Sequence, residues 1–347
     1  MPESKKVFIK TFGCAQNVAD SERIRAFYQL NGLTEVDDWR KADLVVINSC
    51  IVRESAENRV YGLVNEIRKT KKPKFVILTG CLAGLNKNKK IKGVDEIWPI
   101  EKFDLKIKPI RDEEKVALIS ISSGCNNFCS YCIVPYARGR EKSGSFEEIL
   151  SEVDEAIKNG FKEVVLIGQN VNSYGKDKNP PKSPFDKGDL ILFPKLLEEV
   201  AKKPLEKISF VSSNPWDFSD ELIETIAKYP NIDRLVHLPL QSGNDEILRK
   251  MNRKYTAKEY LGLVKKIKNN IKDVRFSTDI IVGFPGEDEK AFQKTVAVCK
   301  KVGFEIAYLN KYSPRKGTVA AKLYKDEIPQ AEKKRRWRIL DDLVNQK

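Results

Sequence analysis

Histidine is almost absent from this sequence, since the 347 residues include a single one, His237. Histidine is the commonest metal ligand in proteins, and one imidazole cannot complete the two groups of cysteines described below. Long hydrophobic runs are absent too, because none approaches the roughly 18 apolar residues of a membrane helix. The N-terminus also lacks the apolar core of a signal peptide, since Lys10 and Thr11 end its apolar run early. We therefore expect a cytoplasmic protein with no membrane segment.

Basic residues outnumber acidic ones, with 63 Lys and Arg against 49 Asp and Glu and a formal net charge of +14. Such an excess favours a polyanionic partner such as nucleic acid, although a lysine-rich soluble surface gives the same number. Charge alone therefore leaves RNA or DNA binding open. The basic runs are scattered, at residues 69–74, 86–92, 265–272 and 332–338.

The first third of the chain alternates strand and helix patterns. Apolar runs at 6–12, 44–48 and 74–80 predict buried strands, and the segments between them carry apolar residues at the three-to-four spacing of helices. This alternation predicts a parallel sheet flanked by helices, an α/β arrangement of the doubly wound kind. The pattern breaks into a charged stretch near 100–115, so we expect a first domain at residues 1–112.

A second series of strands and helices follows over residues 113–330. It contains about six βα units, an incomplete barrel by count, since a closed (β/α)8 barrel needs eight; an open doubly wound sheet is the alternative. Residues 174–189, rich in Pro, Lys and Asp, are expected to form a mobile surface insertion. Residues 331–347 predict a basic helical tail. The strand candidates are 116–122, 163–170, 207–213, 234–241, 274–284 and 305–313.

Six of the seven cysteines follow predicted strands, while Cys299 lies in a helical pattern and is expected to be a small core residue. An odd count in a reducing compartment argues against a disulfide framework and favours metal binding or catalysis. Carboxyl ends of parallel strands share one edge of the sheet, so thiols distant in sequence can converge there. The local trio, in a C-x3-C-x2-C pattern, is Cys125, Cys129 and Cys132; the assembled trio, from three strand ends, is Cys14, Cys50 and Cys81.

Three thiolates suit some metal groups better than others. Structural zinc takes four ligands, and His237 cannot complete both trios. A catalytic zinc on three thiolates is an alternative, but it would be highly charged and a poor Lewis acid. Iron–sulfur clusters are held by thiolates, and a four-iron cluster on three cysteines leaves one iron free to bind a substrate or cofactor. The missing fourth ligand is then the functional position.

The C-x3-C-x2-C spacing after the first strand of a partial barrel, with Tyr131 before its last cysteine, resembles the radical S-adenosylmethionine (SAM) superfamily. Within it, the sequence resembles the methylthiotransferases over roughly residues 6–345, and GQNVNSYG and GCAQNVADSE look most like the MiaB branch. The segments that resemble the family are TFGCAQNVADSER, NSCIVRESAENRVYG, GCLAG, GCNNFCSYCIVPYARGRE, LIGQNVNSYG, HLPLQSGNDEILRKMNRKYT, STDIIVGFPGE and YSPRKGTVAA.

This resemblance implies an N-terminal methylthiotransferase domain followed by a partial (β/α)6 radical SAM barrel. It implies two [4Fe–4S] clusters, an auxiliary one on the assembled trio and a SAM-binding one on the local trio. One SAM methylates a sulfur attached to the auxiliary cluster, and a second is cleaved to a 5′-deoxyadenosyl radical. The methylthio group then replaces hydrogen at C2 of N6-isopentenyladenosine, at position 37 beside the tRNA anticodon. That C–H bond offers no handle for acid–base catalysis, so the cofactor supplies the difficult chemistry.

Polar residues at other strand ends are candidates for contacting SAM or the base, although each can equally satisfy backbone groups. Gly283, Pro285 and Gly286 predict a turn and lack the Lys-Ser/Thr of a phosphate loop. Arg138 and Arg140 are expected either to pair with phosphate or substrate or to be solvated. The cofactor-binding candidates are Gln169, Asn170, Ser212, Ser213, Gln241 and Asp279, with Ser242 beside Gln241.

The resemblance also implies two partners, a tRNA anticodon stem-loop and a flavodoxin- or ferredoxin-like electron donor. The protein itself is expected to be a monomer. Members usually end in a small RNA-binding barrel, the TRAM domain, which would begin near EKKRRWRILDDLVNQK; without it the basic patches are expected to carry more of the RNA binding. Alternative substrates are threonylcarbamoyladenosine in tRNA and an aspartate of a ribosomal protein, and another radical SAM reaction is a further alternative. A non-catalytic zinc-bearing RNA-binding module would explain the charge but not two open trios or six βα units.

Overall fold

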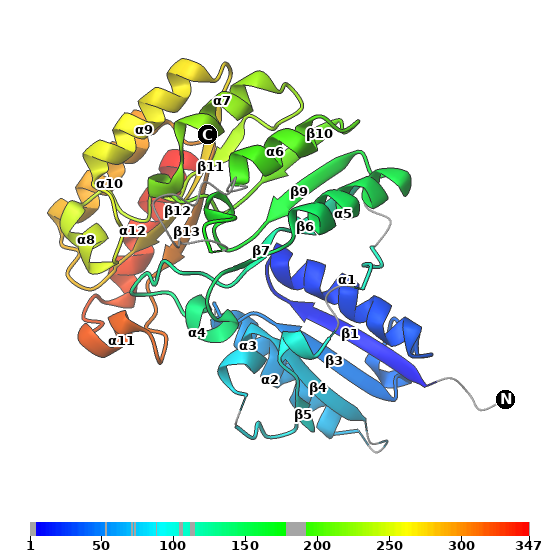
Figure 1. Ribbon diagram of the computed structural model, residues 1–347. Helices are drawn as coiled ribbons and strands as arrows, with labels where there is room; N and C mark the ends of the chain where they lie inside the picture. Colours follow the sequence, from blue (N-terminus) through cyan, green and yellow to red (C-terminus); the bar gives the residue numbers. More distant parts are fainter. Residues whose placement is uncertain are drawn as a thin grey trace, which may run out of the picture.

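The computed structural model describes residues 5–346 apart from residues 53, 71, 73, 88, 104–106, 112–114 and 178–191. A parallel sheet with flanking helices forms the N-terminal part, and an open barrel of strands with outer helices forms the rest (Figure 1). This α/β architecture confirms the fold class expected from the sequence. None of the helices in the described part of the chain is long and apolar enough to cross a membrane.

The N-terminal sheet has five parallel strands in the order β2-β1-β3-β4-β5. Its three central strands coincide with the predicted apolar runs. The two edge strands were not expected, because a two-residue strand leaves no periodic pattern to detect. The strands are β1 (Lys6–Phe12), β2 (Thr34–Glu35), β3 (Leu44–Ser49), β4 (Phe75–Gly80) and β5 (Glu96–Ile97).

Helices cover both faces of this sheet. Alternate residues of a strand point to opposite faces, and Val46 packs with Ile24 of α1, whereas Val45 and Ile47 pack with Val60 of α2. The sheet is therefore doubly wound, which explains the uninterrupted apolar run of β3. The helices and single turns here are α1 (Ala15–Leu30), η1 (Trp39–Lys41), α2 (Glu54–Arg68), α3 (Cys81–Leu85) and η2 (Ile100–Lys102).

The barrel contains six parallel strands among the described residues, in two hydrogen-bonded groups, β10-β9-β6 and β11-β12-β13. A parallel bridge between Ile208 of β10 and Ile232, in the segment that leads into β11, lies between the two groups. This confirms the six predicted βα units and an incomplete barrel. The strands are β6 (Val116–Ser120), β9 (Glu163–Ile167), β10 (Lys207–Phe210), β11 (Leu235–His237), β12 (Arg275–Val282) and β13 (Ile306–Lys311), beside a small antiparallel pair, β7 (Ser122–Ser123) and β8 (Lys142–Ser143).

Several of the barrel helices begin at a residue whose side chain caps them. Ser145 and Asp288 accept hydrogen bonds from the third backbone N–H of the helices that follow, and Thr256 forms a reciprocal capping box with Glu259. Each such cap is worth about 1 kcal/mol. The helices and turns are α4 (Val134–Arg138), α5 (Phe146–Lys158), η3 (Val171–Ser173), α6 (Phe193–Ala201), η4 (Pro215–Asp217), α7 (Asp220–Lys228), α8 (Asp245–Lys250), α9 (Ala257–Asn270), α10 (Glu289–Val302), α11 (Val319–Leu323) and α12 (Gln330–Val344).

The segment expected to be a basic tail forms α12, which packs against the barrel beside β13 (Figure 1). Its Lys333 side chain is fully buried, and the ammonium donates to the Tyr312 carbonyl and pairs with Asp326. Arg336 is buried against Glu287 at 2.8 Å. Much of this basic run therefore holds the helix to the barrel and is not available to bind RNA.

Cys299 and the start of the expected surface insertion can both be located in the structure. Cys299 is 2% exposed and lies in the main barrel core, as predicted. The segment expected to be a surface insertion starts at Tyr174, whose ring is buried and whose hydroxyl donates to the Gly144 carbonyl. The first residues of that segment are therefore packed, and its residues 178–189 lie outside the described part.

Polar side chains fix the N-terminal sheet to the barrel. Gln16 at the start of α1 donates to the Ser120 hydroxyl at the end of β6, 2.9 Å away. Arg23 on the same helix pairs with Glu152 of α5 at 2.6 Å, and Arg111 pairs with the other oxygen of Glu152. These largely buried contacts bring the start of α1 beside the end of β6, where the two cysteine trios lie.

Candidate active site

The assembled trio meets at one edge of the N-terminal sheet, as the strand-end argument predicts. Phe12 pairs with Ser49, and Ser49 pairs with Gly80, so Cys50 and Cys81 follow paired positions and Cys14 lies just beyond β1. Burial raises the pKa of the Cys81 thiol to about 11, and the proximity of Cys50 and Cys14 adds to that rise. The three thiols are therefore electrostatic neighbours.

Two buried asparagines hold the loops of this trio. The Asn17 amide donates to Asn48 Oδ1 at 2.9 Å, and Asn48 donates to the Asn17 carbonyl and to the Ser21 hydroxyl. Gly80 has φ +81, and a Cβ there would lie 2.3 Å from Asn48 Oδ1, so only glycine fits before Cys81. The sequence reading missed Asn17 and Asn48, although both stand three or fewer positions from a cysteine.

The local trio lies on the loop that follows β6 and β7. Ser130 fixes this loop, since its N–H donates to the Met251 carbonyl, its hydroxyl to the Lys250 carbonyl, and its own carbonyl accepts from Ala320 N–H. Burial raises the pKa of Cys125 to about 11 and that of Cys132 to about 12. Such thiols ionise when a bound cation compensates the thiolate charge, which suits them as metal ligands.

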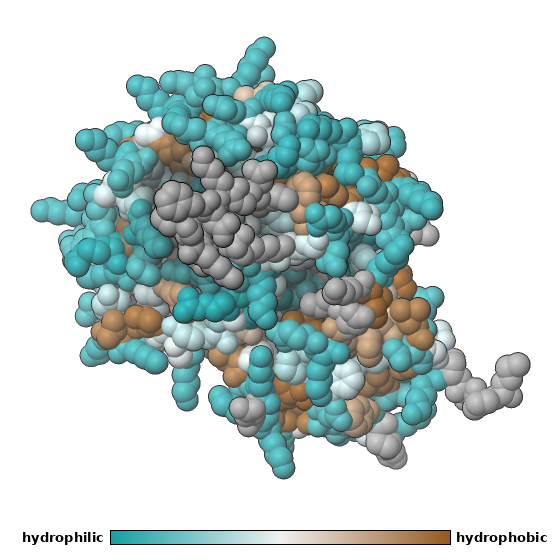
Figure 2. All heavy atoms as spheres, viewed as in Figure 1, coloured by the Kyte–Doolittle hydropathy of each residue, from teal (hydrophilic) through white to brown (hydrophobic). Residues whose placement is uncertain are grey.

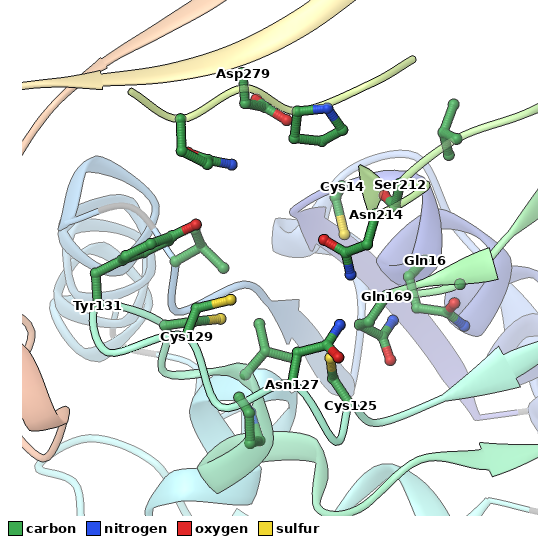
Figure 3. Close-up of a pocket in the computed structure, with 18 of the residues that line it drawn as sticks. Cys14, Gln16, Cys125, Asn127, Cys129, Tyr131, Gln169, Ser212, Asn214 and Asp279 are labelled. Carbon is green, nitrogen blue, oxygen red and sulfur yellow. The ribbon is translucent and has the colours of Figure 1, made fainter. Parts of the chain in front are cut away.

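A cavity of about 340 Å³ lies between the two trios, within the range of small-molecule sites. Figure 3 shows Cys14 on one side of it and Cys125 and Cys129 on the other. A second cavity of about 720 Å³ shares part of this wall, including Cys132 and Asp279. One continuous region of the surface therefore faces all three thiols of the local trio and one thiol of the assembled trio.

Four of the six cofactor-binding candidates line the first cavity: Gln169, Ser212, Gln241 and Asp279. The other two are held elsewhere. The Asn170 amide donates to Asp217 at 2.7 Å, and the Ser213 hydroxyl donates to the His237 carbonyl. Ser242 is also fully buried, near Thr295.

Two of these cavity residues have buried polar atoms without a hydrogen-bond partner among the described residues. These atoms are the side-chain oxygens of Gln169 and Gln241. A buried carbonyl oxygen left unpaired costs about 1–3 kcal/mol. Gln241 and Ser212 also have φ of +64 and +67, a strained backbone for non-glycine residues that is common at ligand sites. Both features are typical of a ligand-binding site. The unpaired oxygens would accept hydrogen bonds from a ligand with N–H or O–H groups.

Arg253 is a site residue that sequence reasoning missed. Its guanidinium is buried, lies 4.6 Å from the ring centre of Trp216, and donates to the Pro239 carbonyl and, at 3.5 Å, to Cys129 Sγ. No carboxylate within the described ranges pairs with it. A buried unpaired cation is costly, so its natural counter-charge is the thiolate group of the local trio. In the sequence Arg253 is a basic residue between polar neighbours. Many surface residues have the same surroundings, so the pattern does not distinguish a buried site residue.

The single histidine lies beside this cavity and does not belong to either trio. His237 Nε2 lies 3.0 Å from Asp279 Oδ2, and its Nδ1 lies 3.1 Å from the Ser277 hydroxyl. Both partners come from β12, the neighbouring strand. The imidazole therefore orients the Asp279 carboxylate at the cavity wall.

The arrangement of the thiols distinguishes a cluster from a single ion. Across the described part of the chain, no three His, Cys, Asp or Glu side chains lie close enough to hold one metal ion. A four-iron cluster places each thiolate on a different iron, so its ligands need not meet at a point. The thiolate-only donor sets therefore fit iron–sulfur clusters better than zinc.

Arg138 and Arg140 were each expected either to pair with phosphate or substrate or to be solvated, and only Arg138 differs from both options. Arg138 is buried and pairs with Asp20 at 2.6 Å. Arg140 is exposed and stacks on Phe128, 4.6 Å from its ring centre. Arg138 is thus committed inside the protein.

The family comparisons agree with this site. Residues 119–299 match the Radical SAM superfamily, and residues 6–98 match the Uncharacterized protein family UPF0004. The fold and the site thus define a radical SAM protein with an added N-terminal domain.

Comparison with similar proteins identifies the family within the radical SAM superfamily. The tRNA-2-methylthio-N(6)-dimethylallyladenosine synthase of Thermotoga petrophila is 42% identical over 97% of this chain and 81% of its own length. The enzyme of that name from Clostridium novyi is 41% identical over 99% of this chain and 82% of its own. The chain belongs to the family of tRNA-2-methylthio-N(6)-dimethylallyladenosine synthases.

Solved structures share the fold at much lower identity. The radical SAM methyltransferase TsrM from Kitasatospora setae has a TM-score of 0.64 and 14% identity, over 92% of this chain and 77% of its own. The cobalamin-dependent radical SAM enzyme OxsB has a TM-score of 0.57 and 9% identity, over 97% of this chain and 56% of its own. These likenesses concern the arrangement of sheet and barrel.

Proposed function

We propose that this chain methylthiolates C2 of N6-isopentenyladenosine at position 37 of tRNA, using SAM and two [4Fe–4S] clusters. The observation that carries the proposal is the cavity lined by Cys14 and by all three cysteines of the local trio. A substrate bound there lies between the two thiol sets, as a reaction that needs both a radical and a sulfur donor requires. The family membership supplies the substrate class.

In this proposal each trio holds one cluster. Cys14, Cys50 and Cys81 hold the auxiliary cluster, and the local trio holds the cluster that binds SAM. When bound, these groups supply the hydrogen abstraction and the methylated sulfur that an unactivated C–H bond requires. The auxiliary domain corresponds to residues 1–112 and the radical SAM domain to residues 113–330, consistent with a gap between the end of β5 and the start of β6.

The protein's own groups bind and orient the reactants. Gln169 and Gln241 offer unpaired buried oxygens to N–H or O–H donors of SAM or the base. Asp279 presents a carboxylate that His237 holds in place at 3.0 Å. The buried side chain of Ile167 adds an apolar surface to the same cavity. Asn170 and Ser213, the other two candidates from the sequence, support the residues of the cavity wall through their hydrogen bonds to Asp217 and to the His237 carbonyl.

The partners follow from the same chemistry. The substrate is the anticodon stem-loop of tRNA, and the net charge of +14 favours such a polyanion. Hydrophilic residues cover most of the face seen in Figure 2. A flavodoxin- or ferredoxin-like donor supplies electrons to the monomer, and we place the reaction in the cytoplasm, where thiols stay reduced.

The test is nucleoside mass spectrometry on tRNA from cells that lack their own methylthiotransferases and express this chain anaerobically. The expected result is a methylthio gain on isopentenyladenosine, which disappears when Cys125 is replaced by Ala. A gain on threonylcarbamoyladenosine would overturn the substrate and keep the chemistry. Bound zinc with no iron or sulfide in the anaerobically purified protein would overturn the chemistry itself.

A further inference from the structure

Arg138, a residue of the barrel part of the chain, binds a thiol of the assembled trio. Its Nε–H donates to Cys81 Sγ at 3.0 Å, and its Nη2 pairs with Asp20 Oδ2 at 2.6 Å. The Arg138 side chain is 4% exposed. A fixed, buried cation therefore lies against one sulfur ligand of the proposed auxiliary cluster.

Close packing of two short helices brings the two residues together. Cys81 is the first residue of α3 and Arg138 is the last residue of α4. A Cβ at Gly84 of α3 would lie 2.0 Å from the Ala137 carbonyl oxygen of α4. Since only glycine allows this approach, the short distance between Arg138 and Cys81 is built into the backbone.

Asp20 on α1 fixes the orientation of the guanidinium. Its side chain is 6% exposed, and its second oxygen accepts from the Gln16 amide at 3.2 Å. A guanidinium is a rigid planar fork with several donors, so Asp20 holds one end while Nε faces the sulfur. A lysine has one donor centre and cannot hold both partners in this geometry.

We propose that Arg138 is a positioning residue of the auxiliary iron–sulfur cluster, whose N–H bond to Cys81 raises the reduction potential of that cluster. Hydrogen bonds to ligand sulfurs withdraw electron density from the metal and stabilise its reduced form. Neither other cysteine of that trio receives a side-chain hydrogen bond from a cation among the described residues. Cys81 is thus set apart from Cys14 and Cys50. This inference rests on the proposed function, because it requires a cluster on the assembled trio.

The test isolates the auxiliary cluster in a full-length background in which Cys125, Cys129 and Cys132 are replaced by Ala. The reconstituted protein is titrated with reductant anaerobically and followed by electron paramagnetic resonance and visible absorption. We expect Arg138→Gln to shift the potential to a more negative value and Arg138→Lys to give a smaller shift in the same direction. The matched control is Arg140→Gln, two residues away and exposed, which should leave the potential unchanged.

Removing Arg138 alone leaves the Asp20 carboxylate buried, so a double variant guards against misfolding. Asp20→Asn combined with Arg138→Gln removes both charges and should show a smaller shift in the same negative direction, because no unneutralised carboxylate remains, while iron content and the circular dichroism spectrum are retained. An unchanged potential in the folded, iron-loaded double variant would overturn the role of Arg138. Failure of the background protein to bind any four-iron cluster would instead overturn the cluster assignment, and the role of Arg138 with it.

Discussion

Asn17 and Asn48 bind each other in both directions: the Asn17 amide donates to Asn48 Oδ1 at 2.9 Å, and the Asn48 amide donates to the Asn17 carbonyl at 2.8 Å. Both side chains are fully buried. The pair ties the start of α1 to the end of β3, and so fixes Cys14 relative to Cys50. A site assembled from distant segments depends on such ties, because side chains must be held within about half an ångström to act together.

Replacing Asn48 with Ala tests this tie. The change leaves the Asn17 amide unpaired in the interior and should lower the free energy of unfolding by about 1–3 kcal/mol, measured by urea denaturation under anaerobic conditions. The iron content of the assembled trio should fall as well. The matched control is Asn31→Ala, because Asn31 is exposed and its side chain donates to the Phe27 carbonyl at the end of its own helix. Equal destabilisation by both changes would contradict a special role for the pair.

Replacing Arg253 with Met tests the counter-charge of the local trio. The variant keeps a long side chain beside Trp216 and removes the cation that lies 3.5 Å from Cys129 Sγ. Iron and sulfide analysis should show the loss of about one four-iron cluster per chain, while Arg253→Lys should retain most of it. Lys254→Met is the control, since Lys254 lies near the same ring and has no hydrogen bond to a cysteine in the described part of the chain. Full iron loading of the Met variant would show that the local trio does not need Arg253 as its counter-charge.

Sequence reasoning found the trios but not the contacts that support them, for a physical reason. The position of a cysteine after a strand follows from local periodicity, and the parallel order of β1, β3 and β4 then brings Cys14, Cys50 and Cys81 to one edge. No local pattern encodes contacts such as Arg138 with Asp20, which lie 118 positions apart.

The basic segment of α12 shows a second limit of sequence reasoning. Lys and Arg are almost never fully buried unless they are paired, and the sequence predicted only a basic helical tail here. Lys333 and Arg336 are buried because Asp326 and Glu287, each outside the helix, pair with them. Which basic residues of a run find such partners is decided by the tertiary fold and cannot be read from the run itself.

Glu141 predicts a pH-dependent stability. Burial raises the pKa of this carboxyl from 4.5 to about 6. A group whose pKa is higher in the folded state stabilises the protein below its unfolded pKa, and that contribution is lost as the pH rises through about 6. Glu141→Gln keeps an oxygen to accept from the Ser173 hydroxyl and carries no charge. The variant should therefore melt at a higher temperature than the parent near pH 8.

The control for Glu141 makes the same charge change at an exposed position. Glu224→Gln on α7 should have little effect on the melting temperature at either pH. Near pH 5 the difference between Glu141→Gln and the parent should become much smaller, because the native carboxyl is then mostly protonated. A difference that is the same near pH 5 and pH 8 would rule out titration of Glu141 as its cause.

Arg315 is predicted to stabilise the loop that carries Cys50. From the barrel, its guanidinium donates to the Ile51 carbonyl at 2.7 Å and to the Val52 carbonyl at 3.2 Å, and the Val52 N–H in turn lies 3.3 Å from Cys50 Sγ. Arg315→Ala removes both donors and should increase amide hydrogen exchange over residues 50–52, since exchange reports local opening. Lys316→Ala, at the exposed neighbouring position, is the matched control. Unchanged exchange in the Arg315 variant would show that the N-terminal sheet holds this loop without help from the barrel.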